Sequence, residues 1–178
     1  MWTGSLDKSG SPTLKISIHG YSSDRAQEFD AIIDTGFTGF IAMPLVRAFS
    51  LGLILFGTTT VVLADGSTKY KLTALGSALK EGQTEVGVII LDENSSDVLI
   101  GMDFLRTFKK VLIMHPHAPF VILEDCATID NMLSEVAETV AKRAAERSAA
   151  NAQPELPAIE STPSEETKDP QSKSEEKP

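Results

Sequence analysis

The sequence predicts a mostly β domain, a closed or sandwiched barrel with short helices, followed by a C-terminal helix and a disordered tail. Three observations predict it: many short apolar runs bounded by turn residues, a later stretch with helical spacing, and a final segment rich in Pro, Glu, Ser and Lys. The 178 residues, 42% of them hydrophobic, suffice for one sizeable core. We expect a β domain over 1–125, a helix over 126–150 and an acidic disordered tail over 151–178.

The first third of the domain reads as strands, turns and one short helix. In order, the pattern predicts a strand at 13–19, a turn at 20–24 and a strand at 28–33. The second strand delivers Asp34 at its end. Pro44 then opens a short helix that closes near Leu51 and Gly52, because Pro suits the first turn of a helix and Gly suits its exit.

The rest of the domain reads as hairpins. Ala64-Asp65-Gly66 is a tight turn signal between two strand-like runs. The expected strands lie at 58–63, at 67–72, around 81–82 and at 86–91, with a last hairpin about 115–117. Many short strands with few helices are typical of a closed or sandwiched β domain.

Residues 128–149 predict a helix. Apolar residues recur there at helical spacing: Ile129, Met132, Leu133, Val136 and Val140. This stripe fits a helix laid on the surface of the β domain and equally a helix that pairs with its copy in a dimer. It spans too few turns to indicate a coiled coil.

Charge and cysteine content limit the partners and the compartment. The net charge of −9 argues against nucleic acid as a main partner, because phosphate binding needs a clustered basic face. No apolar run reaches the length of a membrane span, and the first residues lack the pattern of a signal peptide. The single Cys126 cannot form an intrachain disulfide, so we expect a reducing, cytoplasmic setting and no membrane.

Two separated motifs carry the chemistry. Asp34-Thr35-Gly36 follows an apolar strand, which makes Asp34 a candidate for general acid/base work. Leu99-Ile100-Gly101 ends a second apolar strand and leads into a short helix; a Gly there lets another backbone approach closely.

This pair of motifs resembles the retropepsin-like (clan AA) aspartic proteases, in particular the small single-domain bacterial ones. The resemblance implies a closed acid-protease-like β barrel that hydrolyses peptide bonds in a protein or peptide substrate with no cofactor and no metal. Such enzymes use two carboxylates that share one proton, and this chain has one Asp34-Thr35-Gly36. A homodimer would therefore complete the dyad, with Thr35 and Gly36 shaping the catalytic turn. By position, Ala64, Asp65 and Gly66 fall where these proteases carry the flap over the substrate.

The sequence departs from the retroviral pattern at three places. Those enzymes have a small residue after Asp-Thr-Gly, then an acid that pairs with an Arg following the downstream Gly. Here the three positions hold Phe37, Thr38 and Met102. Both members of the ion pair are missing together, which indicates replacement by apolar packing.

Other interpretations stay open beside the protease. The fold could serve a non-catalytic dimerisation or peptide-binding module that binds an extended segment by strand addition. Asp34 could merely hold a turn. His115 and His117 could form a metal pair but lack a third ligand nearby, and Cys126 lacks the neighbours of a catalytic thiol.

Overall fold

The computed structural model describes residues 1–21, 23–62, 66–115 and 117–151. Ten strands occur in these described residues: β1 (Trp2–Leu6), β2 (Pro12–His19), β3 (Gln27–Ile33), β4 (Ile41–Pro44), β5 (Ile54–Val62), β6 (Thr68–Lys80), β7 (Gln83–Asp92), β8 (Leu99–Ile100), β9 (Lys110–Met114) and β10 (Phe120–Asp125). The helices of the same residues are η1 (Ser23–Arg25), α1 (Leu45–Ala48), η2 (Phe49–Leu51), α2 (Met102–Thr107) and α3 (Cys126–Asn151).

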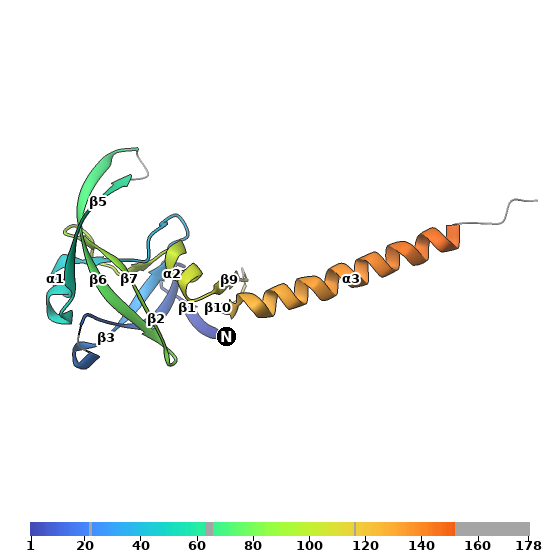
Figure 1. Cartoon of the computed structure of the whole chain (residues 1–178), viewed down its shortest axis with the longest axis horizontal. Helices are drawn as coiled ribbons and strands as arrows, with labels where there is room; N and C mark the ends of the chain where they lie inside the picture. The colour runs from blue at the N-terminus through green and yellow to red at the C-terminus, as the bar shows by residue number, and fades with distance from the viewer. Residues whose placement is uncertain (22, 63–65, 116, 152–178) are drawn as a thin grey trace, which may run out of the picture. The chain divides into compact units, whose positions relative to one another are not determined.

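The strands form one sheet in the order β5-β6-β7-β4-β8-β3-β2-β1-β10-β9. An additional pairing of β2 with β6 closes β2, β3, β8, β4, β7 and β6 into a ring (Figure 1). The expectation of a mostly β, closed barrel with short helices and a C-terminal helix is thus confirmed. The far ends of β5 and β6 extend from this ring as a long hairpin (Figure 1).

Alternation of side chains builds the barrel core. Leu14, Ile16 and Ile18 of β2 are fully buried, whereas Lys15 between them is exposed. Side chains two apart on a strand lie on one face, so β2 contributes one complete apolar row to the interior.

Two strands were not among those expected. The short β1 carries Gly4 and polar residues, but Trp2 is only 2% exposed and pairs with Leu123 of β10. The strand β4 lies between β7 and β8. It pairs parallel with β7 and antiparallel with β8. Because its partners come from distant parts of the sequence, local pattern alone did not identify it.

An aromatic cluster fills the space beneath α2. Its members are Trp2, Phe40, Phe104 and Phe108, and ring centroids of Phe104 and Phe108 lie 4.6 Å apart. Tilted and edge-on ring pairs of this kind add to the free energy gained by burial. The cluster fixes α2, whose N-terminus follows Gly101, against the barrel.

Glycine lies at two turns, of which only the first was predicted. The helical segment that Pro44 opens ends at Gly52, which takes the left-handed conformation with φ of 69°. The strand expected around 81–82 is wrong, because Glu81 and Gly82, with φ of 49° and 80°, form the turn of the hairpin between β6 and β7. Two successive positive φ angles are the geometry of the tight turn that suits twisted strands.

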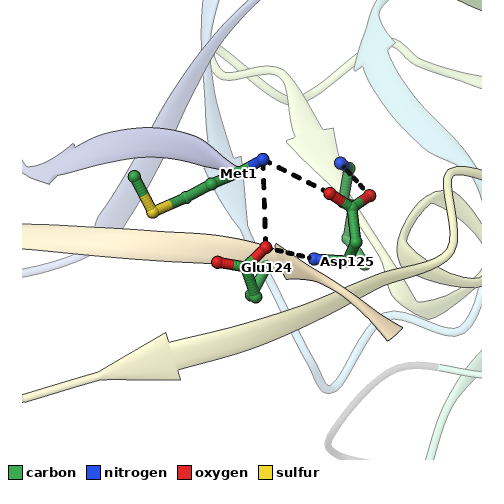
Figure 2. Close-up of polar contacts among 4 residues, drawn as sticks. Met1, Glu124 and Asp125 are labelled. Atoms are coloured by element: carbon green, nitrogen blue, oxygen red, sulfur yellow. Dashed lines mark hydrogen bonds and ion pairs between the residues drawn. The ribbon is translucent and has the colours of Figure 1, made fainter. Parts of the chain in front are cut away.

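A buried lysine holds the end of β10. The side chain of Lys110 is 1% exposed, its Nζ lies 2.6 Å from Asp125 Oδ1, and it lies 4.3 Å from the centroid of the Trp2 ring. The amino group of Met1 lies 3.3 Å from Asp125 Oδ2 and 3.9 Å from Glu124 Oε1 (Figure 2). The hydrogen bond from Lys110, followed by that from the Met1 ammonium, holds the pKa of Asp125 below its usual value.

The chain divides into two units, residues 1–137 and 138–178. The first holds the barrel and the first turns of α3, in which Met132, Leu133 and Val136 are exposed. The second, in its described part, is the rest of α3. No helix of the described residues is long and apolar enough to cross a membrane. The tail expected over 151–178 lies, apart from Asn151, outside the described residues.

Candidate active site

The turn after β3 fixes the carboxylate of Asp34. The backbone N–H of Gly36 donates to Asp34 Oδ1 at 2.9 Å, and the N–H of Phe37 donates to the Asp34 carbonyl at 3.2 Å. Asp34 is half-buried, while Thr35 and Gly36 are exposed. The structure therefore places the three predicted catalytic residues in one tight turn, with the carboxylate in a defined orientation.

The second motif, Leu99-Ile100-Gly101, and the residue after it are hydrogen-bonded to this turn. The Asp34 N–H donates to Ile100 O at 3.0 Å, and the Met102 N–H donates to Phe37 O at 2.8 Å. A Cβ on Gly101 would overlap the carbonyl oxygens of Phe37 and Gly39. Only glycine permits this approach, so the two sequence motifs form one structural unit.

The three residues that depart from the retroviral pattern, Phe37, Thr38 and Met102, lie where the Asp34 turn contacts the segment around Gly101. Met102 packs against the hydrophobic core, and the Phe37 ring lies over Gly39, where an added Cβ would be 2.5 Å from Cζ. The Asp103 N–H donates to the Thr38 carbonyl at 3.1 Å. Apolar packing and backbone hydrogen bonds thus join the two turns where an ion pair would stand in the retroviral pattern.

A cleft of about 450 Å³ opens beside Asp34. Its apolar lining includes Phe37, Ala42, Ile90 and Leu99. A second cleft of about 660 Å³ is also lined by Phe37 and Ile90, together with Thr38, Gly87 and Asp103. The two clefts adjoin, because Gly36, Phe37, Val61, Val62 and Ile90 line both.

The β5–β6 hairpin lines both clefts through Val61 and Val62, which the sequence analysis did not single out. Gly66 lies at the other side of the hairpin turn and is exposed, with φ of 79°. Ala64 and Asp65, the other two expected flap residues, lie outside the described residues. The sequence here runs Thr58-Thr59-Thr60-Val61-Val62, without the alternation that would have marked one Val as facing a cleft.

Two charged residues in the cleft were also missed. Lys71 and Asp92 line it together with Asp34, and Lys71 Nζ lies 2.7 Å from Asp92 Oδ1. Burial acts to raise the pKa of Asp92, but hydrogen bonds from Lys71 and the Asn94 backbone, with the charges of Lys71 and Lys69, hold this pKa below its usual value. Asp92 is therefore ionised at neutral pH.

On its other side, Asp34 faces a shallower pocket. This pocket is lined by Asp34 and Thr35 together with Pro12, Leu112 and Met114. Met114 and its neighbour Ile113 are exposed. Asp34 thus borders two apolar surfaces: this pocket, lined by Leu112 and Met114, and the cleft lined by the β5–β6 hairpin.

The remaining candidates lie elsewhere. The rings of His115 and His117 have centroids 5.8 Å apart, and the His117 N–H donates to His115 Nδ1 at 3.2 Å. No group of three His, Cys, Asp or Glu side chains that could hold a metal occurs among the described residues. Cys126 is half-buried at the start of α3.

Comparisons with known proteins concern the fold. No protein-family model matches the sequence, and no curated protein matches it either. Among solved structures, an inhibitor complex of the EIAV protease is similar with a TM-score of 0.49 and 14% identity, over 61% of this chain and 97% of that one. A retropepsin-like aspartic protease from Rickettsia conorii is similar with a TM-score of 0.45 and 16% identity, over 68% of this chain and 87% of that one.

Proposed function

We propose that this protein is an aspartic endopeptidase whose catalytic dyad consists of Asp34 from each of two identical chains. The observation that carries the proposal is the orientation of one carboxylate: Gly36 holds Asp34 at the junction of a peptide-sized cleft and an exposed edge. A single carboxylate there is half of an acid/base pair. A two-fold axis beside the turn supplies the other half from the same residue.

In the proposed mechanism the two carboxylates share one proton. The ionised Asp34 takes a proton from a water molecule, which attacks the carbonyl carbon of the substrate, while the protonated Asp34 donates a hydrogen bond to the carbonyl oxygen. The roles then reverse as the leaving amine is protonated. Thr35 and Gly36 position the carboxylate, and the hairpin bearing Val61 and Val62 covers the bound peptide.

The surface beside the turn supports the dimer. Thr35 is exposed, and Leu112 and Met114 line the pocket that reaches Asp34 from outside the covered cleft. Apolar groups next to an incomplete site are what a self-complementary interface needs at its centre. We expect a protein or peptide substrate, because the two adjoining clefts are partly apolar and share Phe37, Val61 and Ile90 in their lining.

The test uses the purified full-length chain and a diverse peptide library analysed by mass spectrometry. We expect cleavage by the unaltered chain and none by Asp34→Asn, which keeps the shape of the side chain but cannot share the proton. Asp30→Asn is the matched control, because Asp30 lies on β3, the strand that leads into the Asp34 turn, with an exposed side chain 4.0 Å from Lys15. Equal cleavage by Asp34→Asn and Asp30→Asn would remove Asp34 from the mechanism.

Mixing tests the shared dyad directly. If each site needs two Asp34 residues, re-equilibrating the active chain with an equal amount of Asp34→Asn should lower the total rate to roughly half, because mixed dimers are inactive. Adding Asp30→Asn should raise the rate instead. An unchanged rate with Asp34→Asn would mean that one chain suffices. Peptide binding without any cleavage would favour the non-catalytic binding module.

A further inference from the structure

A charged pair lies in an otherwise largely apolar cleft. Lys71 of β6 and Asp92 of β7 contact each other at 2.7 Å, and their side chains are 11% and 31% exposed. Leu72 pairs with Leu91 in the antiparallel ladder, so Lys71 and Asp92 face each other one step further along the same two strands. They form a cross-strand pair of opposite charges.

This pair belongs to the wall of the cleft. Along β7, every second residue lines one or both clefts: Val88, Ile90 and then Asp92. Residues two apart on a strand share a face. The wall therefore changes from apolar to charged on approaching the part of the cleft that also contains Asp34.

Barrel stability does not require charges here. A partly buried ion pair must offset the cost of desolvation, and an apolar pair of similar volume is often as stable or more stable. The preceding residues on the same face of β7, Val88 and Ile90, are apolar. A charged pair that faces a cleft beside a candidate catalytic carboxylate has a further use in binding.

Asp92 is the member available to a ligand. It is the more exposed of the two, and within the described part of the chain both of its hydrogen bonds, from Lys71 Nζ and the Asn94 N–H, go to Oδ1. The oxygen Oδ2 is thus left to accept from a third group. An acidic ligand, in contrast, could reach Lys71 only in competition with Asp92.

We propose that Asp92, held in place by Lys71, forms a subsite beside Asp34 that selects a lysine or arginine side chain of the substrate. This inference rests on the proposed endopeptidase function. Among the described residues that line this cleft, the charged ones are Asp34, Asp92 and Lys71, so carboxylates outnumber ammonium groups and a cation could offset the difference. An ammonium or guanidinium donates a charge-assisted hydrogen bond to a carboxylate, and the guanidinium fork suits it best.

The apolar floor fits the rest of such a side chain. Ala42 and Leu99 pair across β4 and β8, and both line this cleft with Ile90. The methylene stem of Lys or Arg packs on apolar surface while its charged end reaches a polar partner. A short acidic side chain has no such stem, and it would meet Asp92 as a like charge.

The experiment compares peptides that differ at one position. In a peptide with one identified cleavage site, Lys, Arg, Leu and Glu replace each flanking residue in turn, and kcat/KM is measured with the full-length chain. At one position we expect Lys and Arg to exceed Leu by about fivefold or more, with Glu slowest. Asp92→Asn should abolish this preference, whereas the exposed Asp30→Asn should keep it.

A binding measurement separates the two proposals. The Kd values of the same peptides for the Asp34→Asn chain, followed by fluorescence anisotropy, should show the same preference for Lys and Arg without turnover. The charge-reversed variant Lys71→Glu/Asp92→Lys should favour the Glu peptide. No cleavage by the unaltered chain, with the basic preference still present in binding, would overturn the endopeptidase function alone. Cleavage or binding with no basic preference, a preference for Glu, or a preference that survives Asp92→Asn would overturn the subsite alone.

Discussion

Replacing Gly101 by Ala tests whether the contact between the two turns holds the candidate site together. The added Cβ would overlap the carbonyl oxygens of Phe37 and Gly39 and lie 2.6 Å from Phe37 Cδ1. Non-bonded carbon atoms settle near about 3.5 Å, so one turn has to move by roughly 1 Å. Both oxygens belong to the backbone and cannot rotate away as a side chain would.

The magnitude follows from what that movement disturbs. Inserting a methyl group into a packed region costs about 1–3 kcal/mol. The same movement stretches the hydrogen bond from Met102 N–H to Phe37 O, and losing it adds about 1 kcal/mol. We therefore expect the free energy of unfolding to fall by about 2–4 kcal/mol. Peptide cleavage should fall by about 100-fold, because a displacement of roughly 1 Å misplaces the Asp34 carboxylate.

Urea unfolding measures the first effect, with the fluorescence of Trp2, the single tryptophan, as the signal. Gly10→Ala is the matched control. Gly10 has φ of 84° and no atom near an added Cβ, so its substitution carries only the cost of a left-handed alanine, about 1 kcal/mol. If Gly101→Ala is as stable as Gly10→Ala and cleaves peptides at the unaltered rate, the role assigned to Gly101 is wrong.

Substitutions at three other sites have different expected results. Trp2→Ala should lower the free energy of unfolding by about 3–5 kcal/mol, measured by urea titration with circular dichroism, because it empties the aromatic cluster; a loss near zero would contradict this. Asp34→Asn should not lower the melting temperature, since it removes a charge and breaks no core contact; a large drop would point to a structural carboxylate. The pKa of Asp125 is lowered by Lys110 and the Met1 ammonium, so its stabilisation is present above about pH 4 and is lost as pH falls through that lowered pKa. The melting temperature of Asp125→Asn should accordingly depend less on pH between neutral and strongly acidic conditions than that of the unaltered chain.

Local sequence patterns predicted those strands and helices that adjacent residues specify without reference to distant parts of the chain. The alternation in β2 and the Pro44 and Gly52 boundaries of the α1–η2 segment describe each element by itself, and these predictions are confirmed. The β6 strand was expected to end at Leu72 but continues to Lys80, because its buried positions there, Ala74, Gly76 and Ala78, hold small residues that give no strand signal.

The sequence did not predict the cleft residues whose position depends on the register between strands. Lys71 and Asp92 are ordinary charged residues until the β6–β7 ladder places them opposite each other, and the sequence does not state that register. The same holds for Val61 and Val62 as cleft residues. The motif of Asp34, Thr35 and Gly36 could be found because its chemistry is concentrated in three adjacent positions.

The contact between the Asp34 turn and the segment around Gly101 also affects how fast the candidate site forms during folding. Its hydrogen bonds join Asp34 to Ile100 and Phe37 to Met102, partners about 65 positions apart in the chain. Closing a loop of that length costs conformational entropy before the stabilising contacts form. Such topologies therefore fold slowly, and the local hairpins form first. A chain that has formed its β5–β6 and β6–β7 hairpins but has not yet joined β3 to β8 therefore has most of a cleft wall without an oriented Asp34 carboxylate. Any activity that needs this carboxylate, including the proposed peptide hydrolysis, is thus delayed until the barrel has closed.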